Sequence, residues 1–294
     1  MDKMDNFKLR TEVNVTRENT NLDYDSTILM LGSCFTTEIG AILQDYRFNV
    51  MINPFGTLYN PASILNSLQR LSSSTMFVEE DVIHTNPTNP SADKKYASFY
   101  HHSSFARLSA EEFLKNANNH LVEAHSWLKK TDTIIITLGT AWVFIDNATG
   151  KIVSNCHKRV AKEFTRKLLS VEETHSKLSS IADMFPDKKI IFTVSPIRHF
   201  KDGAHGNQIS KSTLLMGVEK TVQEHGWCSY FPSYEIMMDE LRDYRFYAED
   251  MVHPSPLAVK YIFEKFKYSH ISETAFKQME MNLRLTRAEN HIQK

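Results

Sequence analysis

Short apolar segments alternate along this chain with segments of helical hydrophobic period, and this alternation limits the folds open to it. The strand-like segments are residues 27–31, 48–52, 133–138, 190–194 and 228–231. Strands separated by helices pair in parallel through right-handed crossovers, and the resulting sheet is covered on both faces. We therefore predict a flavodoxin-like three-layer α/β/α fold whose five-stranded parallel sheet has the strand order 2-1-3-4-5.

The segment at residues 27–40, TILMLGSCFTTEIG, predicts a buried strand, a sharp turn and the start of a helix. Gly32 can supply a positive φ or a close backbone approach at the turn. Ser33 would then lie at the carboxyl end of a strand and at a helix N-terminus. Ligands bind at this position in open α/β sheets, and the amides and helix dipole there favour negative charge on a reacting oxygen.

A base for Ser33 is available near the other end of the chain. Asp250 and His253 lie three residues apart, just before a helix that Ser255 would cap. This spacing can place both side chains on one face of a turn, where the carboxylate would fix the tautomer of the imidazole and support the imidazolium. Cys34 is an alternative nucleophile. We favour Ser33, because the side chain of the following residue should point away from the cleft.

Six blocks of sequence resemble the GSCFA family, which is related to the SGNH (GDSL-type) hydrolases. They are GSCF at 32–35, NPFG at 53–56 with YNP at 59–61, TLGTAW at 137–142, NCHK at 155–158, SPIRH at 195–199 and DMVH at 250–253. The resemblance extends over about residues 27–266 and implies the same sheet order. It also implies a catalytic triad in which Ser33 is the nucleophile and Asp250 and His253 are the other members, with no cofactor.

We expect an oxyanion hole at Ser33, Gly56 and Thr140, of which the resemblance implies the amide of Gly56. Ser33 and Gly56 would donate backbone amides, and Thr140 its hydroxyl or its amide. SGNH enzymes normally deliver an Asn from a G-x-N-D block at the end of the third strand, whereas this chain has GTAW there. Asn53 or Asn155 could supply the missing side-chain donor from elsewhere, and Thr140 could equally be a small residue of a strand-end turn.

Polar side chains on the loops at the predicted carboxyl edge of the sheet are candidate substrate-binding residues. They are Asn53, His101, His102, Asn155, His157, Arg198 and His199. Arg198 could hold a carboxylate or phosphate by two hydrogen bonds, or it could pair with an acidic neighbour. The spacings of the histidines match no recognised ligand pattern, so we expect no metal site.

These observations predict a serine hydrolase that cleaves a carboxylic (acyl) ester through a Ser-His-Asp triad and an acyl-enzyme. The expected substrate is a small-molecule or carbohydrate acyl ester, the carbohydrate by analogy with SGNH relatives. Two alternatives remain open: an acyltransferase that uses the same acyl-enzyme, and a non-catalytic ligand-binding module on the same fold. The absent third-block Asn favours the binding module, and the intact triad residues count against it.

Composition argues against several other classes of function. The formal net charge is −1, with 34 basic and 35 acidic residues, so neither a nucleic acid nor a membrane surface is an expected partner. The three cysteines are far apart and match no disulfide or zinc pattern. Because the N-terminus lacks the apolar stretch of a signal peptide, we expect a cytoplasmic protein.

We expect one large domain with two insertions. A polar N-terminal extension at 1–26 precedes an SGNH-like hydrolase domain at 27–270, and a C-terminal helix follows at 271–294. The insertions are residues 72–108, most of which have loop composition, and residues 141–169, which begin with a predicted hairpin. Residues 201–207 are expected to form a loop, and the helix after them to be capped by Gly226.

Overall fold

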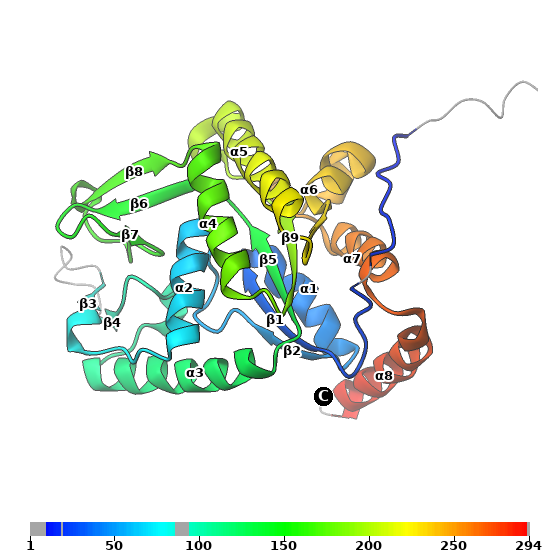
Figure 1. The fold of residues 1–294 in the computed structure, drawn as a ribbon, viewed down its shortest axis with the longest axis horizontal. Coiled ribbons are helices and arrows are strands. Elements are labelled where there is room, and N and C mark those ends of the chain that lie inside the picture. The colour runs from blue at the N-terminus through cyan, green and yellow to red at the C-terminus, as the bar shows by residue number, and fades with distance from the viewer. Residues whose placement is uncertain (1–9, 19, 86–93, 293–294) are drawn as a thin grey trace, which may run out of the picture.

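The computed structural model describes residues 10–18, 20–85 and 94–292. A parallel sheet of five strands runs through its centre, with helices on both faces (Figure 1). The strands are β1 (Thr27–Gly32), β2 (Asn49–Ile52), β5 (Thr133–Leu138), β9 (Lys189–Val194) and β10 (Cys228–Phe231). Their order is β10-β9-β5-β1-β2, and each neighbouring pair is parallel. The predicted fold class and strand order are both confirmed.

Successive residues of the central strands face opposite helix layers. In β1, Leu29 and Leu31 join one apolar cluster, and Ile28 and Met30 join the other. The first layer consists of α2 (Pro61–Ser73), α3 (Ala110–Lys130), α4 (Val171–Met184) and α5 (Gly203–Glu224). The second consists of α1 (Cys34–Asp45), the π-helical turn Ile236–Leu241 that follows α6 (Ser233–Glu235), α7 (Pro256–His270) and α8 (Glu273–Ile292). Burial on both faces explains why the strand sequences are almost continuously apolar.

The helices that follow two of the site loops begin at the residues that the sequence predicts. Asn60 caps α2 by accepting a bond from Ser63 N at 2.8 Å, and Ser255 caps α7 by accepting one from Ala258 N at 3.3 Å. Each cap is followed by a proline, which needs no hydrogen bond at that position.

Helix α5 differs from the prediction at both ends. The 3₁₀ turn Phe200–Asp202 leads directly into it, so most of 201–207 is helical and not a loop. Its C-cap is His225, which is extended, and not Gly226. The early start is explained by tertiary contact: the Asn207 side chain accepts a hydrogen bond from the backbone of the preceding loop, which residue propensity alone does not reveal.

The first insertion contains more structure than its loop composition predicts. It includes the 3₁₀ turns Glu79–Asp81 and Ser103–Phe105 and a two-stranded antiparallel sheet of β3 (Ile83–His84) and β4 (Tyr96–Ala97). The Asn- and Pro-rich part of the predicted loop, residues 86–90, lies outside the described residues.

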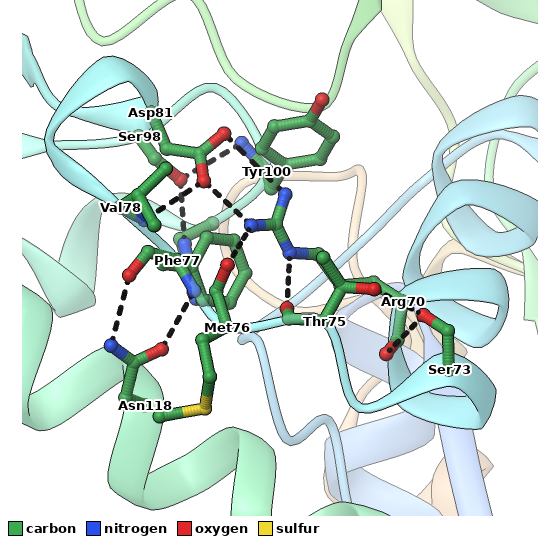
Figure 2. A network of polar contacts seen from close by, with 11 residues as sticks. Arg70, Ser73, Thr75, Met76, Phe77, Val78, Asp81, Ser98, Tyr100 and Asn118 are labelled. Carbon is green, nitrogen blue, oxygen red and sulfur yellow. Dashed lines mark hydrogen bonds and ion pairs between the residues drawn. The ribbon is translucent and has the colours of Figure 1, made fainter.

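Arg70 of α2 connects this insertion to the first helical layer by hydrogen bonds and an ion pair (Figure 2). Its guanidinium donates to the carbonyl oxygens of Thr75 (2.9 Å) and Met76 (2.7 Å) and to the Asp81 carboxylate (2.6 Å). It also lies 3.8 Å from the centroid of the Phe77 ring. These contacts hold the chain that leaves α2 against the body of the domain.

The second insertion forms a small antiparallel sheet beside the main one. The predicted hairpin is confirmed as β6 (Trp142–Asp146) and β7 (Ile152–Val153). A third strand, β8 (Phe164–Leu168), was not predicted; it follows the 3₁₀ turn Ala161–Glu163 and pairs with the other edge of β6. This sheet extends away from the carboxyl end of β5 (Figure 1).

The described part of the N-terminal extension packs against the C-terminal helices. Leu22 is buried and forms a parallel bridge with Ile271, and Val13 N donates to the Glu240 carboxylate. In the part of the chain that the structure describes, helices long enough to cross a membrane are not apolar enough to do so.

Candidate active site

A cleft of about 480 Å³ opens at the carboxyl edge of the central sheet. Its walls come from the loops after β1, β2, β5 and β9, from the small β6–β7 hairpin, and from the loop before α7. The lining residues are Ser33, Cys34, Tyr59, Asn60, Thr140, Trp142, Phe144, Val153, Ser154, Ile197, His199, Val252 and His253. The structure therefore brings Ser33 and His253 together with Thr140 and His199.

Ser33 occupies a sharp turn that depends on Gly32. Gly32 has φ 146°, and a Cβ atom there would collide with the carbonyl oxygen of Thr137 on β5. Ser33 is the N-cap residue of α1, yet its side chain makes no capping hydrogen bond. Its Oγ is buried and has no partner among the described residues. Because serine at this position usually satisfies a helix amide, the unused hydroxyl indicates a role other than capping.

Asp250 and His253 form a pair within one tight loop. Asp250 Oδ1 accepts the backbone N–H groups of Val252 and His253, both at 2.9 Å, and Oδ2 lies 2.6 Å from His253 Nδ1. These backbone bonds, and then the imidazole bond, lower the pKa of the Asp250 carboxyl to about 2. The carboxylate is thus charged at neutral pH and fixes Nδ1 as the protonated nitrogen, which leaves Nε2 to act as a base.

The loop that carries this pair is held by its own backbone. Ala248 N donates to the carbonyl oxygen of His253 at 2.8 Å. Ser255 N donates at 2.7 Å to the carbonyl oxygen of Phe246, the last residue of the 3₁₀ turn Tyr244–Phe246. Arg198 N donates to the carbonyl of Val252 at 3.3 Å and so connects this loop to the one after β9.

No hydrogen bond joins Ser33 Oγ to the imidazole of His253 in this structure. Ser33 Oγ is unpartnered among the described residues, while the His253 side chain lies at the same cleft and is 46% exposed. Catalytic hydrogen bonds are often long in ligand-free proteins and tighten when a substrate binds. Ser33 and His253 both line the cleft.

The backbone amides predicted for the oxyanion hole are bonded elsewhere. Ser33 N donates to Thr137 O (3.2 Å), Gly56 N to Asn53 O (2.7 Å) and Thr140 N to Tyr59 O (2.9 Å). Gly56 is also absent from the described lining of the cleft, because it packs against the side chain of His102.

Two other donors remain near Ser33. The Thr140 hydroxyl lies 3.0 Å from Ser210 Oγ and accepts from Trp142 N, so its proton is free whenever Ser210 is the donor of that pair. The first amide of α1, that of Cys34, has no acceptor within the helix because of its position. Both Thr140 and Cys34 line the cleft.

His199 is the one residue of the predicted substrate-binding set that the structure places in the described lining of the cleft. Burial first, and then electrostatic repulsion from Lys211, lowers the pKa of its imidazole to about 4. The ring is therefore neutral at physiological pH, and its buried Nε2 has no partner among the described residues. It can donate to, or accept from, an uncharged ligand group.

Three predicted residues make structural contacts instead. Asn53 Oδ1 accepts from Gly32 N at 2.8 Å and so supports the turn before Ser33. Asn155 Oδ1 accepts from His157 N at 2.8 Å within its own turn. The Arg198 guanidinium lies 4.5 Å from the ring centroid of Phe200.

The three remaining histidines are held within the first insertion or against it. His101 is fully buried among phenylalanine rings, and burial lowers its pKa to about 3. His157 is also buried, and its Nε2 lies 2.7 Å from the carbonyl oxygen of Ser98. His102 caps the 3₁₀ turn that follows it. None of the three is among the described residues of the cleft wall.

The sequence interpretation missed the aromatic wall of the cleft. Trp142 and Phe144 lie two residues apart on β6 and therefore on one face of the strand, a signal that the alternating sequence contained. Arg166 stacks 4.2 Å from the Trp142 ring centroid and is ion-paired with Asp202. The indole Nε1 is buried and unpartnered among the described residues.

Cys34 departs from its predicted orientation. Its side chain was expected to point away from the cleft, but Cys34 lines it and its Sγ lies 3.7 Å from Tyr59 Oη. The difference arises because the first turn of α1 borders the cleft directly, so two successive residues reach it.

The described wall of the cleft contains no permanently charged side chain. The described lining residues include no Lys, Arg, Asp or Glu. Across residues 10–18, 20–85 and 94–292, no three His, Cys, Asp or Glu side chains form a group that could hold a metal ion.

Comparison with known protein families identifies the chain. The sequence model described as the GSCFA family matches residues 27–266, which includes every block that forms the cleft. Among curated proteins, none matches the sequence.

Proposed function

The chain belongs to the GSCFA family, and on this premise we propose that it is a serine hydrolase that cleaves carboxylic acyl esters. One observation carries the proposal. A buried serine hydroxyl without a partner among the described residues, and a histidine whose other nitrogen is bound to a carboxylate, line the same cleft. These are the parts that nucleophilic acyl transfer requires.

In this proposal His253 Nε2 removes the proton of Ser33 as Oγ attacks the acyl carbonyl. The Asp250 carboxylate stabilises the imidazolium that forms. The Thr140 hydroxyl and the Cys34 amide are the donors available for the developing oxyanion. His253 then protonates the leaving alcohol, and the acyl-enzyme is hydrolysed by a water molecule that the same imidazole deprotonates.

The wall of the cleft limits the substrate class. A charged group near the scissile bond would find no described counter-charge there and would lose hydration on entry. Aromatic rings beside neutral hydrogen-bonding groups suit an uncharged small-molecule or carbohydrate ester. Transfer of the acyl group to an acceptor other than water would use the same residues.

Fluorophosphonate labelling tests the proposal without a known substrate, because the reagent phosphonylates an activated serine. We expect the wild-type protein to be labelled at Ser33 and Ser33→Ala not to be labelled. Cys34→Ala is the matched control, one residue away in the same cleft, and should still be labelled. Labelling at Cys34, or no labelling of the wild-type protein, would overturn the proposal.

A panel of neutral short-chain and sugar esters would then separate the alternatives. Release of free acid indicates hydrolysis, while product that appears only with an added alcohol or amine acceptor indicates acyl transfer. Binding of an ester without turnover, together with no labelling, would indicate a ligand-binding module.

A further inference from the structure

A lysine buried beneath the cleft has no role in the mechanism described above. Lys211 projects from α5, and its residue is only 1% exposed. Its Nζ donates to the carbonyl oxygens of Gly139, at 2.8 Å, and of Ser195, at 2.7 Å. These carbonyls follow directly after β5 and β9, so one ammonium group connects the carboxyl ends of two neighbouring strands.

The structure gives this ammonium group two carbonyl acceptors and a nearby aromatic ring. Among the described residues its acceptors are carbonyl oxygens and no carboxylate, and the Tyr234 ring centroid lies 5.6 Å from Nζ. Burial lowers the pKa of Lys211 to about 7. A buried cation without a counter-charge lowers the free energy of unfolding. An apolar side chain of the same length would avoid that penalty. The presence of a lysine at position 211 therefore indicates that its hydrogen bonds are needed to hold the two strand ends in position.

The two carbonyls that Lys211 binds lie at the start of the cleft loops. Gly139 precedes Thr140, and a Cβ atom at Gly139 would be 3.4 Å from the Cβ of Ser33. Ser195 begins the segment that leads to His199, and the charge of Lys211 helps to lower the pKa of the His199 imidazole. A displacement of either strand end would therefore move a cleft residue relative to the nucleophile.

We propose that Lys211 is a positioning residue that holds the ends of β5 and β9 together and so fixes the positions of Thr140 and His199 relative to Ser33. The inference rests on the proposed function in that Ser33 is taken as the group whose reactivity depends on this alignment. Misplacement of a catalytic group by about 1 Å can slow a reaction about 100-fold.

The test compares Lys211→Met with the wild-type protein. Methionine keeps an unbranched side chain of similar length and removes the donors. We expect the maximal rate constant of fluorophosphonate labelling to fall about 10- to 100-fold with a much smaller change in the half-saturating reagent concentration. Amide hydrogen exchange should accelerate in residues 139–142 and 195–199, and not in β1 and β2. Lys220→Met, on an exposed part of the same helix, should match the wild-type protein.

Two outcomes would overturn the inference. One is that Lys211→Met has the same labelling rate constant and the same amide hydrogen exchange as the wild-type protein. The other is that Lys211→Met loses thermal stability while its labelling rate constant is unchanged, which would indicate a stabilising role alone. If Lys211→Met does not fold, Lys211→Gln, which keeps N–H donors on a shorter chain, takes its place under the same criteria. If the wild-type protein is not labelled, the hydrolase proposal fails, and hydrogen exchange at the two strand ends alone decides whether Lys211 holds them.

Discussion

Replacing Asp250 by Asn tests the triad sharply, because the structure dictates how an amide would lie there. Oδ1 accepts two backbone N–H groups, from Val252 and His253, and Oδ2 accepts the imidazole N–H. An Asn side chain has one acceptor oxygen, and the two backbone donors fix it at the Oδ1 position. Its NH₂ group must then face His253 Nδ1, to which it can only donate.

That donation requires the tautomer of His253 that carries its proton on Nε2, and this tautomer cannot accept the proton of Ser33. The reactive tautomer can form only if the amide flips, and the flipped amide loses both hydrogen bonds from the backbone. The loss of each bond shifts the equilibrium between the two amide orientations by a factor of about 2 to 12. The flip alone therefore reduces the reactive population about 5- to 150-fold. Loss of the negative charge beside the imidazolium adds to this, and we expect a total reduction of about 10³- to 10⁴-fold.

The assay is the rate of fluorophosphonate labelling at Ser33 between about pH 5 and 9. Since the pKa of Asp250 is about 2, its carboxylate is ionised over this whole range and produces no acid limb of its own. Asp243→Asn is the matched control, because Asp243 is an exposed cap that accepts from Arg245 N in the same region. Labelling of Asp250→Asn within about threefold of the wild-type rate would refute the tautomer argument.

Two further predictions concern the first insertion. Arg70→Met leaves the largely buried Asp81 carboxylate without its cationic partner and should lower the free energy of unfolding by about 3 to 5 kcal/mol in urea denaturation. A loss below about 1 kcal/mol would show that the insertion is held by other contacts. His101 has its pKa lowered to about 3 by burial, so below its unfolded pKa of about 6.5 the unfolded chain binds a proton that the folded protein does not, and stability falls as the pH falls. In His101→Phe the loss of unfolding free energy between pH 7 and pH 5 should be about 2 kcal/mol smaller than in the wild-type protein, and equal losses would contradict this account.

The sheet and the His253–Asp250 pair were predictable because their information is local. The apolar strand segments and the helical periods between them determine a parallel sheet, and three-residue spacing is enough to place His253 beside Asp250. Lys211 could not be placed from the sequence, because its two acceptors lie 72 and 16 residues away and become neighbours only when the sheet has formed.

The histidines illustrate a second limit. His101 and His199 both follow strands or loops near the predicted carboxyl edge, yet one is packed among phenylalanine rings and the other faces the cleft. The difference is set by how the first insertion folds back on α2 and α3, and composition alone indicates only a loop. The amide of Gly56 is a similar case, since its bond to Asn53 O depends on the detailed shape of one turn.

The aromatic wall gives this protein an internal optical reporter. Of its three tryptophans, Trp127 donates to the carbonyl oxygen of Ile28 on β1, at 3.0 Å, and Trp227 donates to that of Ala182 on α4, at 3.3 Å. Trp142 instead borders the cleft, and its indole N–H is unbonded among the described residues. Occupation of the cleft changes the polarity around one fluorophore and leaves the other two as an internal baseline. Affinities of unreactive ester analogues can thus be ranked by emission alone, with no dye attached and no turnover needed.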